Sequence, residues 1–163
     1  MEKTQRAHGR SVGDKDFVRV RRALPADLDD LIALENASFS SDRLSPRQWK
    51  HHLGSDRASI LLVERQGRTG AAAVLFFRKG SPLARLYSLA VAAELRGRGI
   101  GEVLLEACEG EAAGCGCTQM RLEVRSDNLA AQRLYARRGY RLFASRPGYY
   151  EDGATALCYE KML

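Results

Sequence analysis

Residues 83–125 most constrain the fold, because two runs of strand character stand on either side of one long helical run. The run LARLYSLAV is apolar and of strand length, and QMRLEVR alternates strictly between apolar and charged residues. Between them, residues 99–113 carry apolar side chains at helical spacing, and Gly114 follows as a candidate C-cap. This order predicts two parallel strands joined across the helix.

The rest of the chain predicts antiparallel pairing around this unit. The turn sequences QGRTG and KGSP separate three successive strand candidates, as in an antiparallel meander. We therefore expect one α/β (α+β) domain over residues 17–163, with a mixed central sheet of about seven strands and about four helices. The expected strands are 17–23, 59–65, 70–78, 83–91, 119–125, 140–144 and 156–163, and the expected helices are 25–39, 45–53, 99–113 and 128–138.

Composition serves mainly to exclude classes. No apolar run approaches the ~18 residues that span a bilayer, and the N-terminus has no secretory apolar segment, so we expect a cytoplasmic protein and no membrane partner. The CGC at 115–117 lacks zinc-site spacing, so no metal is expected. Residues 1–22 hold seven basic and three acidic residues, +4 of the net charge of +6. We interpret 1–16 as a basic flexible tail, because no nucleic-acid-binding motif accompanies it.

The sequence RGRGIG (96–101) lies at the junction of the strand 83–91 and the following helix. A helix N-terminus leaves about four backbone N–H groups unpaired and carries roughly half a positive charge. Glycines let an anion approach these groups, and Arg96 and Arg98 add charge, which favours a phosphate-binding turn. The alternative is a glycine turn that only permits close packing. The spacing fits neither the dinucleotide fingerprint nor the P-loop.

In context, this stretch resembles motif A, [QR]-x-x-G-x-[GA], of the GNAT superfamily of acetyl-CoA-dependent N-acetyltransferases, with Arg96, Gly99 and Gly101 in register. LEVRSDNLAAQRLYARRGY (122–140) resembles the second motif, and is similar in particular to the RimI-like ribosomal-protein alanine N-acetyltransferases. RPGYY (146–150) resembles that branch too. The likeness covers 83–163 well and 17–82 loosely. The segment after Tyr150 is shorter than in the ribosomal enzymes, so their acceptor does not carry over.

The resemblance implies a site for acetyl-CoA along motif A. Backbone amides of residues 96–101 would hold its pyrophosphate, and backbone groups of Leu89 and Val91 would hold the pantetheine arm and polarise the acetyl carbonyl. Asn128 would contact the cofactor in addition to capping a helix. The implied cofactor-binding residues are Leu89, Ala90, Val91, Arg96, Gly97, Arg98, Gly99, Ile100, Gly101 and Asn128.

The same resemblance implies two catalytic residues. Glu123 would remove a proton from the acceptor amine, directly or through a water, and its alternative is a strand glutamate paired with Arg121 or Arg125. Tyr135 would donate a proton or a hydrogen bond to the leaving thiolate, and its alternative is a core tyrosine. Deprotonation at pH 7 costs about 1 kcal/mol for an α-amine and about 4–5 kcal/mol for a lysine, which favours N-terminal acceptors.

Three aromatic residues are candidates for the acceptor groove: Phe39, Tyr149 and Tyr150. If the two tyrosines are neighbours in a strand, at most one faces the substrate. Asp42 is either a ligand for a substrate ammonium or an ordinary loop aspartate.

Our hypothesis is direct acetyl transfer to a primary amine, first of all the N-terminal amine of a protein or peptide. A small-molecule amine or a lysine stays open as the acceptor. The alternative function is a non-catalytic acyl-CoA-binding or ribosome-associated module.

Overall fold

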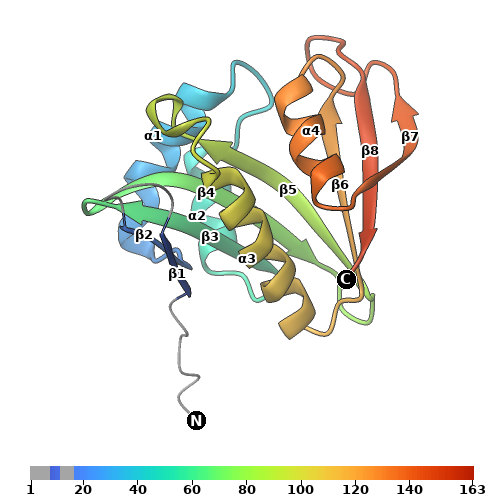
Figure 1. Cartoon of the computed structure of the whole chain (residues 1–163). Helices are drawn as coiled ribbons and strands as arrows, with labels where there is room; N and C mark the ends of the chain where they lie inside the picture. Colours follow the sequence, from blue (N-terminus) through green and yellow to red (C-terminus); the bar gives the residue numbers. More distant parts are fainter. Residues whose placement is uncertain (1–7, 12–16) are drawn as a thin grey trace.

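One mixed sheet organises the chain, and the computed structural model describes residues 8–11 and 17–163 of it (Figure 1). The strand order is β1-β2-β3-β4-β5-β6-β8-β7, and only β5 and β6 pair in parallel. The strands are β1 (His8–Ser11), β2 (Phe17–Arg22), β3 (Ala58–Arg65), β4 (Arg68–Phe77), β5 (Leu83–Val91), β6 (Gln119–Arg125), β7 (Arg141–Arg146) and β8 (Ala156–Met162). The helices are α1 (Leu28–Ser38), α2 (Pro46–Leu53), α3 (Ile100–Gly114) and α4 (Leu129–Arg137), with 3-10 turns η1 (Pro25–Asp27) and η2 (Ala93–Leu95).

The predicted mixed sheet is confirmed, with two differences of detail. The sheet has an eighth strand, β1, in addition to the seven expected ones, and it comes from the segment 1–16 that the sequence predicts as a tail. Residues 1–7 and 12–16 lie outside the described residues. The helix predicted from Pro25 begins at Leu28 instead, after the separate turn η1. Asp27 stabilises this turn, because its carboxylate accepts the N–H of Leu24 at 2.7 Å and hydrogen bonds from both Nη atoms of Arg21.

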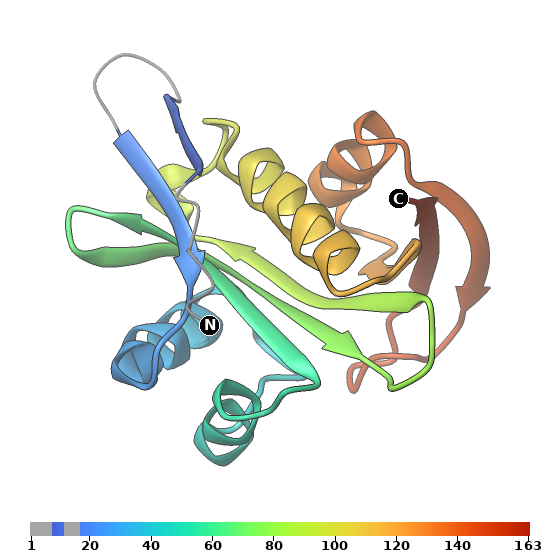
Figure 2. The same cartoon turned by 90° about the horizontal axis from the view of Figure 1, so that it is seen from below.

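The central strands are buried on both faces, which explains their nearly continuous apolar sequences. Along β3, Leu61 and Val63 enter the core under α3 and α4, while Ile60 and Leu62 enter the core under α1 and α2. Figure 2 shows the two helix pairs on opposite faces of the sheet. No helix of residues 8–11 and 17–163 is long and apolar enough to cross a membrane.

The two parallel strands separate half-way along their length. Leu83–Leu86 of β5 pair with Gln119–Leu122 of β6, but beyond these residues β5 stays with β4 and β6 stays with β8. Tyr87 is a bulge in β5, because its neighbours Leu86 and Ser88 pair with consecutive residues of β4. A bulge bends its strand and increases the twist. The strands therefore form the V seen in Figure 1, and the edge of β5 that faces β6 is left without a partner strand.

Candidate active site

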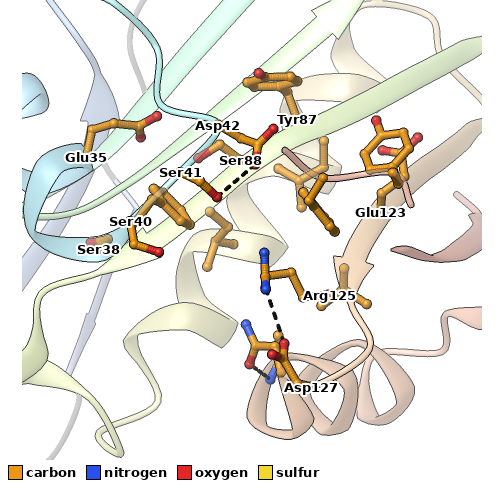
Figure 3. Close-up of a pocket in the computed structure, with 18 of the residues that line it drawn as sticks. Glu35, Ser38, Ser40, Ser41, Asp42, Tyr87, Ser88, Glu123, Arg125 and Asp127 are labelled. Carbon is orange, nitrogen blue, oxygen red and sulfur yellow. Dashed lines mark hydrogen bonds and ion pairs between the residues drawn. The ribbon is translucent and has the colours of Figure 1, made fainter. Parts of the chain in front are cut away.

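A cavity of about 620 Å³ opens where β5 and β6 separate (Figure 3). This volume suits a small-molecule or peptide site. Tyr87, Ser88 and Leu89 of β5 line one wall, and Glu123 and the following residues of β6 line the other. Helices α1 and α4, the segment 39–45 between α1 and α2, and the segment 147–155 between β7 and β8 supply the remaining walls.

Glu123 is the first residue of β6 beyond the paired region, and its carboxylate lines the cavity. Neither ion-pair partner suggested by the sequence is correct. Arg121 binds Glu160, and Arg125 binds Asp127 and Asp152. The partner of Glu123 is Arg85 of β5, whose Nε lies 3.2 Å from Oε2.

Arg85 links Glu123 to Tyr149 across the cavity, and sequence reasoning missed it. Its Nη2 donates to the Tyr149 hydroxyl at 2.8 Å while its Nε donates to Glu123. Burial lowers the pKa of Arg85, but Glu123 and Tyr149 outweigh burial and raise it overall. The sequence alone does not predict this pair, because it depends on the register of β5 against β6. In that register Arg85 lies opposite Arg121, and Glu123 lies on its diagonal two residues further along β6.

We predict that Arg85→Gln releases Glu123 and Tyr149 together. We expect kcat/KM for an acceptor amine to fall about tenfold, with the Kd of acetyl-CoA unchanged, because a charged hydrogen bond contributes about 1.5–3 kcal/mol. Steady-state kinetics and calorimetry measure the two quantities. The matched control is Arg121→Gln, which removes the ion pair with Glu160 outside the cavity. Equal losses in both variants would contradict the role of Arg85.

Tyr135 is a core tyrosine that also lines the cavity. Its ring packs edge-on against Tyr140, with centroids 5.7 Å apart, and only 6% of the residue is exposed, yet it also lines the cavity. Burial raises the pKa of Tyr135, so its hydroxyl stays protonated and able to donate at neutral pH. Asn128 begins the same helix as predicted, with Oδ1 accepting the N–H of Ala131 at 3.1 Å.

Tyr149 and Tyr150 do not lie in a strand, so the reason to expect only one of them to face the substrate does not apply. β7 ends at Arg146, and the two tyrosines follow it in an irregular turn rather than a strand. Both line the cavity, with their rings perpendicular and their centroids 5.0 Å apart. Burial raises the pKa of Tyr150 to about 12. Phe39 lines the cavity from the opposite segment.

Two interactions fix the segment that carries these tyrosines. Arg125 reaches Asp152 through both Nη atoms, at 3.2 and 2.7 Å, and its guanidinium lies 5.1 Å from the centre of the Tyr150 ring. Asp42 accepts the backbone N–H of Glu151 with both oxygens at 3.3 Å. The second interaction joins the segments 39–45 and 147–155 across one end of the cavity.

The residues 96–101 do not line this cavity; they lie at the junction of β5 and α3. Gly97 and Gly99 have φ of 75° and 77°, a left-handed conformation that favours glycine. Gly99 begins α3, and no side chain caps the helix there, whereas Ser45 caps α2. A helix start of this kind leaves its first N–H groups available, which fits the pyrophosphate of acetyl-CoA.

Side chains around this turn have structural roles. Arg96 donates through Nε to the carbonyl of Val91 at 3.2 Å, at the end of β5. Ile100 is 3% exposed and belongs to the core, and Ala90 is buried on the other face of the sheet. A Cβ on Gly101 would lie 3.4 Å from Leu134 of α4, so this glycine allows the two helices to approach.

The fold agrees with comparisons to known proteins. The model of the acetyltransferase (GNAT) family matches residues 28–140, and the chain belongs to this family. It is therefore an N-acetyltransferase of a family that uses acetyl-CoA as its co-substrate.

Two curated relatives and one solved structure are similar to the chain. An uncharacterised N-acetyltransferase of Methanocaldococcus jannaschii is 45% identical over 73 residues, which is 44% of this chain and 47% of the relative, so the match spans about half of that protein. A candidate [ribosomal protein bS18]-alanine N-acetyltransferase of Bacillus subtilis is 27% identical over 88% of this chain and 94% of its own length. The ribosomal-protein-S18-alanine N-acetyltransferase of Escherichia coli has the same fold, with a TM-score of 0.79 and 24% identity over 89% of this chain and 93% of that one.

Proposed function

We propose that the protein transfers the acetyl group of acetyl-CoA to the N-terminal amine of a protein or peptide in the cytoplasm, with residues 17–163 as the catalytic domain. The observation that carries the proposal is the cavity between β5 and β6, which is lined by Glu123 from one side and Tyr135 from another. Residues 96–101 do not line the cavity; they follow β5, one of its walls, and lead into α3. The likeness to the Bacillus subtilis relative supports an N-terminal acceptor.

In this proposal the acceptor amine enters between Phe39 and the two tyrosines of the segment 147–155. Glu123 accepts the proton of the ammonium, directly or through a water. An α-amine suits this residue better than a lysine, because its deprotonation at pH 7 costs about 1 rather than 4–5 kcal/mol.

In this proposal, β5 and α4 position the thioester of acetyl-CoA. Acetyl-CoA supplies the acetyl group in activated form. The free edge of β5 offers backbone groups of Leu89 and Val91 to the pantetheine arm, and Tyr135 donates a hydrogen bond where the thiolate leaves. None of the four cysteines lines the cavity, and three of them are buried, which supports direct transfer rather than an acetylated cysteine.

The test is acetylation of short peptides by the purified protein, read by release of CoA and by mass spectrometry. We expect peptides with a free α-amine to be acetylated there, and the same peptides with a blocked α-amine and an internal lysine to react at least tenfold more slowly. Faster reaction of the blocked lysine peptides would overturn the N-terminal assignment.

We predict that Glu123→Gln lowers the rate of acetyl transfer about tenfold at pH 8 and progressively more toward pH 6. The reason is that the neutral fraction of an α-amine with pKa ~7.7–8 falls about tenfold per pH unit below that value, so assistance by a base matters most there. Rates of both proteins between pH 6 and 8 measure this. A ratio that stays constant with pH would reject Glu123 as the base.

A further inference from the structure

Glu35 of α1 is a buried carboxylate at the acceptor end of the cavity, and the chemistry above does not use it. The residue is 4% exposed and still lines the cavity. Its Oε1 accepts the backbone N–H of Leu44 at 2.9 Å. Among the described residues, Oε2 has no hydrogen-bond or ion-pair partner. Figure 3 shows Glu35 and Glu123 on opposite sides of the view, with Asp42 between them.

The surroundings of Glu35 favour a positively charged ligand. Burial raises the pKa of this carboxyl, because a charge with little contact to water is costly unless it is paired. Arg43 lies close enough to counteract this in part. The Arg43 guanidinium, however, donates to the carbonyls of Asn36 and Phe39 and not to Glu35.

The charges that line the cavity leave an excess of two acidic groups. Six charged residues line it, four acidic and two basic, and two ion pairs account for four of them. The ion pairs are Arg85 with Glu123 and Arg125 with Asp127. The unpaired acids are Glu35 and Asp42. Asp42 uses its oxygens for the hydroxyl of Ser41 and for the N–H of Glu151, which leaves Glu35 as the carboxylate with a free oxygen.

We propose that Glu35 determines acceptor specificity by binding a second positive charge of the acceptor, separate from the reacting amine. For a peptide this charge is an arginine or lysine at the second or third residue. The choice of a peptide rests on the proposed function, whereas the preference for a second cation rests on Glu35 and the charges around it.

The experiment compares acceptors that differ only in this charge. Peptides with arginine at the second or third residue are paired with the same peptides carrying citrulline, which has nearly the same shape and no charge. A second pair is 1,4-diaminobutane and butylamine. We expect the wild-type protein to favour the charged member by about tenfold in kcat/KM, and Glu35→Gln to reduce this ratio to about one.

Two features of the design separate specificity from folding. The glutamine side-chain oxygen can still accept the N–H of Leu44, so Glu35→Gln keeps the bond between α1 and the segment 39–45, and its acetyl-CoA affinity checks the fold. The matched control is Glu151→Gln, which removes an exposed negative charge from the segment 147–155. We expect this control to keep the wild-type ratio.

The outcomes distinguish this inference from the proposed function. A wild-type ratio near one, a ratio that persists in Glu35→Gln, or an equal loss in Glu151→Gln would overturn the role of Glu35 and leave peptide acetylation standing. If no peptide reacts but the diamine is preferred and the preference needs Glu35, the N-terminal acceptor falls and the inference holds. If no probe is acetylated, both are overturned.

Discussion

Replacement of Gly99 by tryptophan is expected to weaken acetyl-CoA binding at least a hundredfold, a change of about 2.8 kcal/mol at 1.4 kcal/mol per tenfold. Gly99 begins α3 at a φ of 77°, and its backbone adjoins the first free N–H groups of the helix. A bulky side chain there strains the left-handed conformation by about 1–2 kcal/mol and occupies the space that a pyrophosphate needs. Titration calorimetry with acetyl-CoA and with CoA measures the loss.

The strain at Gly99 has a matched control elsewhere in the chain. Gly67, in the turn between β3 and β4, has a φ of 75°, and a Cβ built on it meets nothing within 4 Å. Gly67→Trp should therefore lose similar stability but bind acetyl-CoA as the wild type does. Normal binding by a folded Gly99→Trp protein would reject the pyrophosphate site, and equal weakening by Gly67→Trp would show that the loss reflects stability alone.

Patterns of local origin were predictable from the sequence. The alternation of residues 119–125 gave β6 with its correct bounds, and Met120, Leu122 and Val124 are buried as that pattern requires. Asn128 caps α4 because its carboxamide needs only the N–H three residues later. Such features depend on neighbours in the chain, so the sequence contains nearly all of their causes.

Features that depend on distant contacts were not predictable in the same way. Glu123 pairs with Arg85, 38 residues away, although Arg121 and Arg125 lie on the same face of β6. Residues two apart in a strand are separated by about 7 Å along it, and these two arginines bind Glu160 and Asp152 instead. Both tyrosines of the segment 147–155 face the cavity because Asp152 and Asp42 hold that segment as a turn. The burial of Glu35 likewise arises only when α1 packs on the sheet.

The hydroxyl of Tyr135 is expected to have a large effect on kcat and almost none on the affinity for acetyl-CoA. Tyr135→Phe should lower kcat by about 10²–10³-fold, the range typical of a positioned proton donor, and leave the Kd of acetyl-CoA within about twofold. Burial raises the pKa of Tyr135 above the usual value of about 10, whereas a thiol has a pKa near 8.5. Complete proton transfer to the thiolate is therefore uphill by more than about 2 kcal/mol, so a strong hydrogen bond that stabilises the leaving sulfur is the better description.

The neighbouring buried tyrosine makes this prediction specific. Tyr140 packs edge-on against Tyr135, and its hydroxyl is bonded to the sulfur of Met120 at 3.2 Å rather than lining the cavity. Tyr140→Phe removes the same atom from the same core, so a purely structural effect of Tyr135→Phe would be reproduced by it. We expect Tyr140→Phe to retain kcat within about threefold, with a loss of stability of about 1 kcal/mol. Equal losses of kcat in the two variants would reduce Tyr135 to a core residue, whereas a loss confined to Tyr135→Phe would place the hydrogen-bond donor to the leaving sulfur on α4.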